Sequence, residues 1–228
     1  SGEVSNMEAL VVHNGSDAFV TVYNEHHSNT DLLDVTANIV GSNVVVTGTP
    51  FVANSTVKFY RIDLADNESD STGTDFNTIG AVTVSSSDTA IDTFEDTSFT
   101  GAHYVIVGFN NSESSASILE ATVLSNGTQA FVAEGPFVSS KGTAQLNLTA
   151  AHNGSSTVTL SASATSGSST TVNAFRIHML RGDATPFTEL DSFSHSDSQG
   201  ANYIIAMKDA SNRVQMSDVM LVSDGTDA

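Results

Sequence analysis

The chain of 228 residues has no cysteine, no tryptophan and only 7 lysine and arginine residues, against 26 aspartate and glutamate residues. Without cysteine there are no disulfides and no thiolate sites, and the redox compartment stays undetermined. The shortage of cations argues against binding to nucleic acid or to an anionic membrane, because lysine and arginine supply the contacts to phosphate and acidic lipid. The net charge of −19 instead favours solubility.

Targeting and membrane signals are absent as well. No apolar run approaches the roughly 20 residues of a membrane helix, and no basic segment followed by an apolar one opens the chain as a signal peptide would. The chain begins Ser1-Gly2 without methionine, so we expect it to be processed or part of a longer protein. Apolar residues at helical spacing are missing almost everywhere, which argues against helices.

The motifs of common enzymes are also missing. The sequence has no Gly-x-Ser-x-Gly elbow, no phosphate-binding loop and no His-Glu-x-x-His helix. The acidic residues are so numerous that some must lie near one another by chance. Proximity alone is therefore no evidence for the catalytic carboxylate pair of a glycosidase. The lack of tryptophan argues against carbohydrate stacking, although 4 tyrosines and 12 phenylalanines remain. We therefore predict no enzymatic activity, no catalytic residues, no cofactor and no metal.

What the chain does contain is a tandem repeat. Gly101-Ala-His-Tyr-Val-Ile-Val107 returns 99 residues later as Gly200-Ala-Asn-Tyr-Ile-Ile-Ala206, and residues 119–131 match residues 7–19 at an offset of 112. Phenylalanine and tyrosine recur at matching positions, which is typical of a repeated core. Shorter matches are Ile91-Asp-Thr-Phe94 with Leu190-Asp-Ser-Phe193, Ser125-Asn-Gly-Thr128 with Ser223-Asp-Gly-Thr226, and Tyr60-Arg-Ile-Asp63 with Phe175-Arg-Ile-His178.

Alternating apolar and polar residues predict short strands, separated by turn residues about every 8–12 positions, as in a β-sandwich. We predict an all-β fold of tandem β-sandwich units of immunoglobulin-like or Greek-key type. The expected strands are a hairpin within 4–25 and the segments 32–40, 43–49, 55–64, 80–85, 102–109, 117–125, 129–139, 143–151, 156–164, 170–180, 201–208 and 213–223.

The repeat divides the chain into four predicted parts. Residues 1–64 form a sandwich unit that lacks its first strand, and residues 65–86 form an acidic linker with a short strand. Residues 87–183 form a complete unit, and residues 184–228 form the opening strands of a further unit.

Partial units leave strand edges unpaired, and natural β-proteins normally cover such edges. We expect strand addition, from another chain or from sequence beyond this segment, to complete them through main-chain hydrogen bonds. The strand at 4–13 is duplicated at 213–223, which complicates a simple exchange.

Two groups of residues offer metal ligands. Glu25, His26 and His27, with His13 on the paired strand, could supply imidazole and carboxylate groups. Neighbouring residues on a strand point to opposite faces, however, so His26 and His27 cannot easily share one metal. The acidic run 66–75 offers oxygen ligands for Ca²⁺ but lacks the spacing and the glycine of an EF-hand loop, and a solvated linker explains it better.

Two further patterns are explained by local chemistry. Arg181-Gly182-Asp183 spells the cell-adhesion tripeptide, but three residues carry little information. Asn-x-Ser/Thr sequons are abundant, and four fall at predicted turns, where asparagine is favoured because it tolerates positive φ. The sequons are at Asn14, Asn54, Asn67, Asn110, Asn126, Asn147 and Asn153.

The block Ile-Leu-Glu-Ala-Thr-Val-Leu-Ser-Asn-Gly-Thr-Gln-Ala-Phe-Val-Ala-Glu (118–134) has relatives at 6–23 and 215–228. It resembles the β-repeats of virion structural proteins in marine tailed phages such as cyanophages. The family pattern runs from Asp-Thr-Phe through Ala-x-Tyr and Asp/Asn-Gly-Thr-x-Ala-Phe/Tyr to a strand like Val172-Asn-Ala-Phe-Arg-Ile-His178. The likeness covers nearly the whole chain except 65–86, and the chain departs from the pattern in that linker and in its partial terminal copies.

This resemblance implies a non-enzymatic fibre, appendage or decoration protein located in the virion. Its implied partners are its own copies, other virion proteins and a host-surface receptor, without nucleic acid or membrane insertion. A second hypothesis is a secreted or cell-surface adhesin or filament subunit of a bacterium or archaeon. A third is an enzyme acting on polysaccharide, which would depend on a specific pair of carboxylates. Fold class alone does not decide among them.

Overall fold

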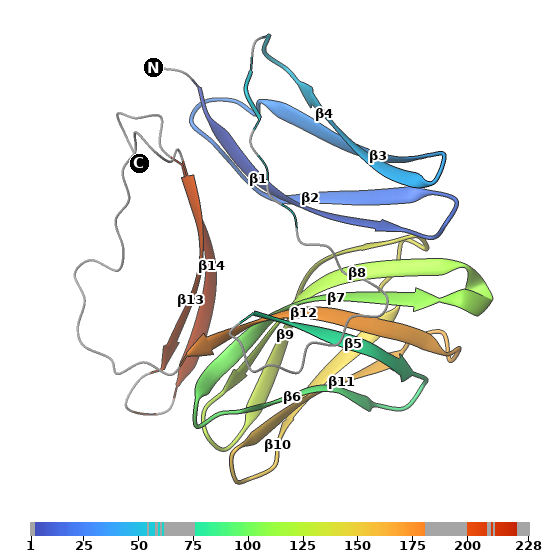
Figure 1. Cartoon of the computed structure of the whole chain (residues 1–228). Coiled ribbons are helices and arrows are strands. Elements are labelled where there is room, and N and C mark those ends of the chain that lie inside the picture. Colours follow the sequence, from blue (N-terminus) through green and yellow to red (C-terminus); the bar gives the residue numbers. More distant parts are fainter. Residues whose placement is uncertain are drawn as a thin grey trace.

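The computed structural model describes residues 3–53, 55–57, 59, 61, 76–180, 200–208, 211 and 213–222. These residues form strands β1 to β14 and one short 3-10 turn, which confirms the predicted all-β class (Figure 1). Among them there is no helix of the length and apolar character needed to cross a bilayer.

The central part of the chain is a sandwich of two antiparallel sheets. A five-stranded sheet has the order β5-β12-β7-β8-β9, and a three-stranded sheet has the order β10-β11-β6. Their strands are β5 (Phe76–Val84), β6 (Thr89–Glu95), β7 (Phe99–Asn110), β8 (Ser115–Ser125), β9 (Ala130–Ser139), β10 (Leu146–His152), β11 (Thr157–Ala164) and β12 (Thr170–Leu180).

The core of this central sandwich lies between the two sheets. Because successive side chains on a strand point to opposite faces, each strand contributes alternate residues to it. Tyr104 and Ile106 of β7 are fully buried against Leu146 of β10 and Leu160 of β11. Complete burial of one such aliphatic side chain contributes about 1.5–3 kcal/mol. The fold of residues 76–180 therefore rests on contacts between the sheets.

The terminal segments form three hairpins. They are β1 (Ser5–His13) with β2 (Ala18–His27), β3 (Leu33–Val40) with β4 (Asn43–Pro50), and β13 (Gly200–Lys208) with β14 (Val214–Val222). The β3–β4 hairpin lies over β1–β2, and the β13–β14 hairpin stands beside the central sandwich and β2 (Figure 1). Among the described residues each hairpin is a separate two-stranded sheet, so only the central unit forms a closed sandwich.

Two strands differ from the sequence-based expectation. β6 is not among the predicted strands, because a bulge opposite Leu160 and Ser161 puts both Ile91 and Phe94 on the core side and breaks the period of two. β5 lies within the segment assigned to the linker 65–86, yet it pairs with β12 at the edge of the five-stranded sheet. The central sheet therefore begins before residue 87.

One predicted strand is not formed in the described residues. Of the segment 55–64, residues 55–57, 59 and 61 belong to no strand, and the remaining positions lie outside the described residues. The acidic run 66–75 and the tripeptide at 181–183 also lie outside the described part of the chain.

Candidate functional site

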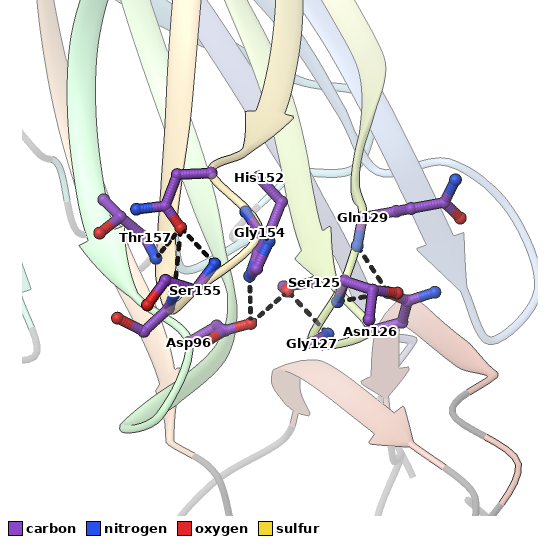
Figure 2. Close-up of polar contacts among 12 residues, drawn as sticks. Asp96, Ser125, Asn126, Gly127, Gln129, His152, Gly154, Ser155 and Thr157 are labelled. Atoms are coloured by element: carbon purple, nitrogen blue, oxygen red, sulfur yellow. Dashed lines mark hydrogen bonds and ion pairs between the residues drawn. The ribbon is translucent and has the colours of Figure 1, made fainter.

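Three strand ends of the central sandwich are joined by one buried carboxylate, Asp96 (Figure 2). Asp96 follows β6, Ser125 ends β8 and His152 ends β10. Ser125 Oγ donates to Asp96 Oδ2 at 2.8 Å, and His152 Nε2 lies 2.9 Å from the same oxygen. The side chain of His152 is 1% exposed and that of Asp96 is 8% exposed. The trio brings together a serine, a histidine and an acid, the residue types of a hydrolytic triad.

The hydrogen bonds within the trio differ from those of a catalytic triad and serve a structural role. In a serine nucleophile site the hydroxyl bonds to the histidine, and the acid bonds to the other ring nitrogen. Here Ser125 bonds to the acid, and His152 Nδ1 accepts the backbone N–H of Gly154 at 2.9 Å. Ser125 Oγ also accepts the N–H of Gly127 at 3.0 Å. Asp96 therefore ties together the Asn-Gly turns that follow β8 and β10, and each hydrogen bond to its carboxylate contributes about 1.5–3 kcal/mol.

Asparagine side chains build these turns. Asn126 Oδ1 accepts the N–H groups of Thr128 and Gln129 at 3.0 and 2.8 Å, and the following Gly127 has φ +90°. Asn153 Oδ1 likewise accepts three backbone N–H groups (Figure 2). The turn explanation of the sequons accounts for these positions. Asn110, which is 1% exposed, caps the turn between β7 and β8 by accepting the N–H of Glu113 at 3.2 Å.

A second buried group crosses the core between the two sheets. Arg176 Nη1 on β12 donates to both carboxylate oxygens of Asp92 on β6, at 2.6 and 2.5 Å. Tyr104 on β7 is the direct cross-strand neighbour of Arg176, and its hydroxyl donates to Asp92 Oδ2 at 2.7 Å. Burial, together with the Asp92 carboxylate, raises the pKa of Tyr104 well above its usual range. We call these three residues the Arg–Asp–Tyr cluster.

The β1–β2 hairpin docks on the outer face of the five-stranded sheet. Leu10 and Val12 of β1 are buried against Ala116 and Ile118 of β8 and Val138 of β9. On β2, the side-chain oxygen Oγ1 of Thr21 donates a hydrogen bond to the carbonyl oxygen of Phe137 at 3.4 Å. The N-terminal unit is thereby anchored to the central sandwich through apolar contacts and side-chain hydrogen bonds.

A polar contact completes this interface. The hydroxyl of Tyr23 donates to Oε1 of Glu120, whose side chain is 10% exposed. Burial, with the Glu120 carboxylate, raises the pKa of Tyr23. His103 lies beside them with its Nε2 3.8 Å from Glu120 Oε2, which is too far for a hydrogen bond. Burial therefore dominates and lowers the pKa of His103 to about 4.

The β3–β4 hairpin exposes an apolar face that its counterpart in the central unit buries. Leu33-Asp-Val-Thr-Ala37 of β3 matches Leu146-Asn-Leu-Thr-Ala150 of β10 at an offset of 113. The strand registers then make Val44 and Val46 of β4 equivalent to Val158 and Leu160 of β11. Val158 and Leu160 are both 0% exposed, whereas Val44 is 36% and Val46 53% exposed.

The β3–β4 hairpin and its counterpart β10–β11 also differ in how the edge of the second strand is paired. In the central unit β11 pairs with β10 on one side and with β6 on the other. Within the described residues β4 pairs with β3 alone. In the segment that follows β4 in the sequence, Phe51 is 62% and Phe59 is 85% exposed. We call the apolar side of β3–β4 and this edge of β4 the open face of the N-terminal unit.

The histidine and glutamate residues that the sequence offered as metal ligands do not lie together in the fold. The β1–β2 register places His13 opposite Ala18 at the turn and His26 opposite Asn6 at the far end of the hairpin. Along β2 these two levels are separated by roughly 25 Å at the usual rise of a strand. In the part of the chain that the structure describes, no three histidine, aspartate or glutamate side chains gather as a metal site. The register therefore separates His13 from Glu25, His26 and His27, which the sequence offered as possible ligands.

Comparisons with known proteins identify no family. No family model matches the chain, and no curated protein matches it. Among solved structures, the tailspike protein of Acinetobacter phage vB_ApiP_P1 is similar at a TM-score of 0.29 and 14% sequence identity. That match covers 56% of this chain and 26% of the tailspike chain.

Proposed function

We propose that this protein is a non-enzymatic structural component of a phage virion, acting as a fibre, appendage or decoration subunit. In this role it assembles with its own copies and with other virion proteins through its repeated β-units. The observation that carries the proposal is the open face of the N-terminal unit, where Val46 is 53% exposed although its counterpart Leu160 is fully buried. Contiguous exposed apolar surface beside an open strand edge is typical of an interaction site.

The rest of the chain supports an assembly role. The repeat provides successive units with matching core positions, and chains of this kind gain stability from neighbouring units. The trio around Asp96 secures turns and presents no exposed nucleophile, since Ser125 is 2% exposed. The resemblance of residues 118–134 to the β-repeats of phage virion proteins supports a phage virion as the particle in which the protein assembles.

The test is the location of the protein in particles. Virions purified on a density gradient are examined by mass spectrometry and by electron microscopy with gold-labelled antibody against the central sandwich. We expect a constant ratio of this protein to the capsid protein and labelling at one defined position on the particle. Labelling of cell-surface filaments without DNA-filled heads would support the adhesin hypothesis instead. Release of sugars from host polysaccharide by the pure protein would overturn the non-enzymatic role.

A further inference from the structure

Strand β4 is an edge strand whose residues are exposed along its whole length. All eight of its residues, from Asn43 to Pro50, are solvent-exposed. Its partner β3 is the strand of this hairpin that contacts β2, and among the described residues β4 pairs with β3 alone (Figure 1). In the complete copy of the repeat, the matching edge of β11 holds a further strand, β6. The edge of β4 that faces away from β3, which we call its outer edge, therefore has the position of a strand-binding edge.

The outer edge of β4 presents the main-chain groups of the even-numbered residues. In an antiparallel ladder, hydrogen-bonded and non-hydrogen-bonded residue pairs alternate. Phe51, which follows β4, donates its N–H to the carbonyl oxygen of Leu32 at 3.0 Å, so the odd-numbered residues bond to β3. Val44, Val46 and Gly48 therefore direct their N–H and C=O groups away from β3, where a further strand would accept and donate.

This edge also lacks the features that protect other edges of the chain. Natural edge strands are normally blocked by charged residues, proline or bulges. In the central sandwich, β9 has a bulge and Pro136, and its Glu134 carboxylate accepts the N–H of Leu148 on β10 at 3.0 Å. By contrast, residues 35–57 carry no charged side chain, and the proline of β4 stands only at its last position, Pro50. The outer edge of β4 is thus open to pairing.

The chemistry of the outer edge favours a second β4 as its partner. The net charge of −19 makes copies of this chain repel one another, so they approach most easily where the facing surfaces are uncharged. The strand runs Asn43-Val-Val-Val-Thr47, which reads almost the same in both directions around Val45. An antiparallel second β4 therefore matches apolar residues with apolar residues and presents the complementary row of donors and acceptors.

We propose that two copies of this chain pair through the outer edges of their β4 strands, antiparallel and about a two-fold axis at Val45. The two hairpins then form one continuous four-stranded sheet of order β3-β4-β4-β3. Val44 of each copy lies opposite Val46 of the other and exchanges main-chain hydrogen bonds with it, and the two Val45 residues form the non-hydrogen-bonded pair between them. This inference rests on the proposed function, because it names the partner of the open face.

Two features place the axis at Val45. An axis at Val46 would set Val44 opposite Gly48, and it would bring Pro50, which has no N–H to donate, into the paired region. With the axis at Val45, Pro50 lies beyond the turn of the other copy, and Val44 and Val46 of both copies form one apolar stripe on the open face. The contact uses the same surface twice, so it closes at two copies.

Like charges at the axis test the contact in the full chain. Val45→Lys sets two lysines directly opposite each other and Val45→Glu sets two glutamates, and like charges directly opposite are destabilising. We expect the wild type to dimerise and each variant alone to show a dimer Kd raised at least about 10-fold. Light scattering after size exclusion, over a series of concentrations, measures the mass. Val45 is 39% exposed in the single chain, so its replacement should leave the hairpin folded.

Mixing the two variants should restore the dimer. At a two-fold axis, the lysine introduced in one copy meets the glutamate introduced in the other. We expect the mixture to reach the mass of the wild type at the same total concentration. A wild type that associates, with a mixture that does not, would show that position 45 meets a different residue and would overturn the two-fold pairing.

A cross-link tests the same position without adding charge. The chain has no cysteine, so Val45→Cys introduces a single thiol. Cα atoms of a non-hydrogen-bonded antiparallel pair are about 4.5 Å apart, within the range that a disulfide spans. We expect a covalent dimer of Val45→Cys on non-reducing electrophoresis after mild oxidation. The control Thr36→Cys is exposed on the same side of β3, one strand inside the edge, and should stay monomeric. Equal yields would indicate random collision and overturn the pairing.

A further control separates assembly from folding. Thr36→Lys adds the same charge as Val45→Lys on the same side of the hairpin, and we expect it to dimerise like the wild type. The urea midpoint of the central sandwich should match in all variants. A wild type that is monomeric at every concentration overturns the proposal.

The outcomes also separate this inference from the proposed function. A monomeric protein that labels virions leaves the virion role standing and removes the β4 pair. A dimer that Val45→Lys breaks, in a protein absent from virions, supports the pair and removes the virion role.

Discussion

The replacement Arg176→Met tests how strongly the Arg–Asp–Tyr cluster holds the central sandwich together. Methionine keeps most of the apolar stem of arginine but removes the guanidinium that contacts both carboxylate oxygens of Asp92. The Asp92 side chain is 10% exposed, so water cannot take over these contacts. Asp92 then retains the Tyr104 hydroxyl from the cluster but no counter-charge from it.

Breaking a buried ion pair from one side costs about 3–5 kcal/mol. For the roughly 105 residues of the central sandwich, an unfolding entropy of about 2.1 cal/mol/K per residue converts this cost into a Tm lower by roughly 14–23 °C. Urea unfolding followed by far-UV circular dichroism gives the free energy of unfolding, and differential scanning calorimetry gives the Tm. The m-value should stay constant, because the folded surface is unchanged.

Two further variants decide whether the cost comes from the uncompensated charge. The triple variant Asp92→Leu/Tyr104→Phe/Arg176→Met removes the whole cluster, and we expect it to lie within about 2 kcal/mol of the wild type, since apolar replacement of a buried pair is often neutral. Lys141→Met breaks the half-exposed contact with Glu113 and should leave the Tm unchanged. A loss below about 1 kcal/mol in Arg176→Met would refute the reasoning. So would a triple variant less stable than the single one.

Two other predictions concern the interface between the β1–β2 hairpin and the five-stranded sheet. Burial lowers the pKa of His103 from 6.5 to about 4, so between these pH values the unfolded chain binds a proton that the folded chain excludes. The free energy of unfolding is therefore highest above pH 6.5, and it falls by about 3 kcal/mol as the pH drops to 4. Urea unfolding of His103→Gln between these pH values should show a correspondingly smaller loss than the wild type, and equal losses would contradict this origin. Tyr23→Phe removes the hydroxyl that bonds to the buried Glu120 and should weaken docking by about 1.5–3 kcal/mol. Hydrogen exchange should then accelerate at the amides of β1 and β2 and stay constant in β11, and uniform acceleration would show general destabilisation instead.

Local chemistry made much of this fold predictable from the sequence. The Asn-Gly pairs at 14–15, 126–127 and 153–154 lie at hairpin turns, and their glycines have φ between +79° and +94°. Alternation of apolar residues located most strands within a few positions of their observed bounds. It failed at β6, where the bulge beside Asp92 interrupts the period. It placed a strand at 80–85 but assigned it to the linker, because its partner β12 is about 90 residues away in sequence. Pairings over such distances leave no local pattern.

The buried clusters were harder to predict than the strands. Arg176 and Asp92 are 84 residues apart, and no spacing rule joins them. The signal that could have found them is the repeat itself, since Ile91-Asp-Thr-Phe94 and Phe175-Arg-Ile-His178 each keep their charged residue in the second copy. A charge retained inside an otherwise apolar core motif indicates a buried partner, because an uncompensated charge there is too costly to keep.

The docking of β1 determines which side of the N-terminal hairpins faces away from the central sandwich. In β8 the core side carries Leu119, Ala121 and Val123, and the matching side of β1 carries Met7, Ala9 and Val11. β1 instead buries its opposite side, with Leu10 and Val12, against the outer face of the central sheet. The core side of the N-terminal unit therefore points away from the central sandwich, toward β3 and β4. A strand that covered the open face would therefore approach from the side opposite to the central sandwich of the same chain.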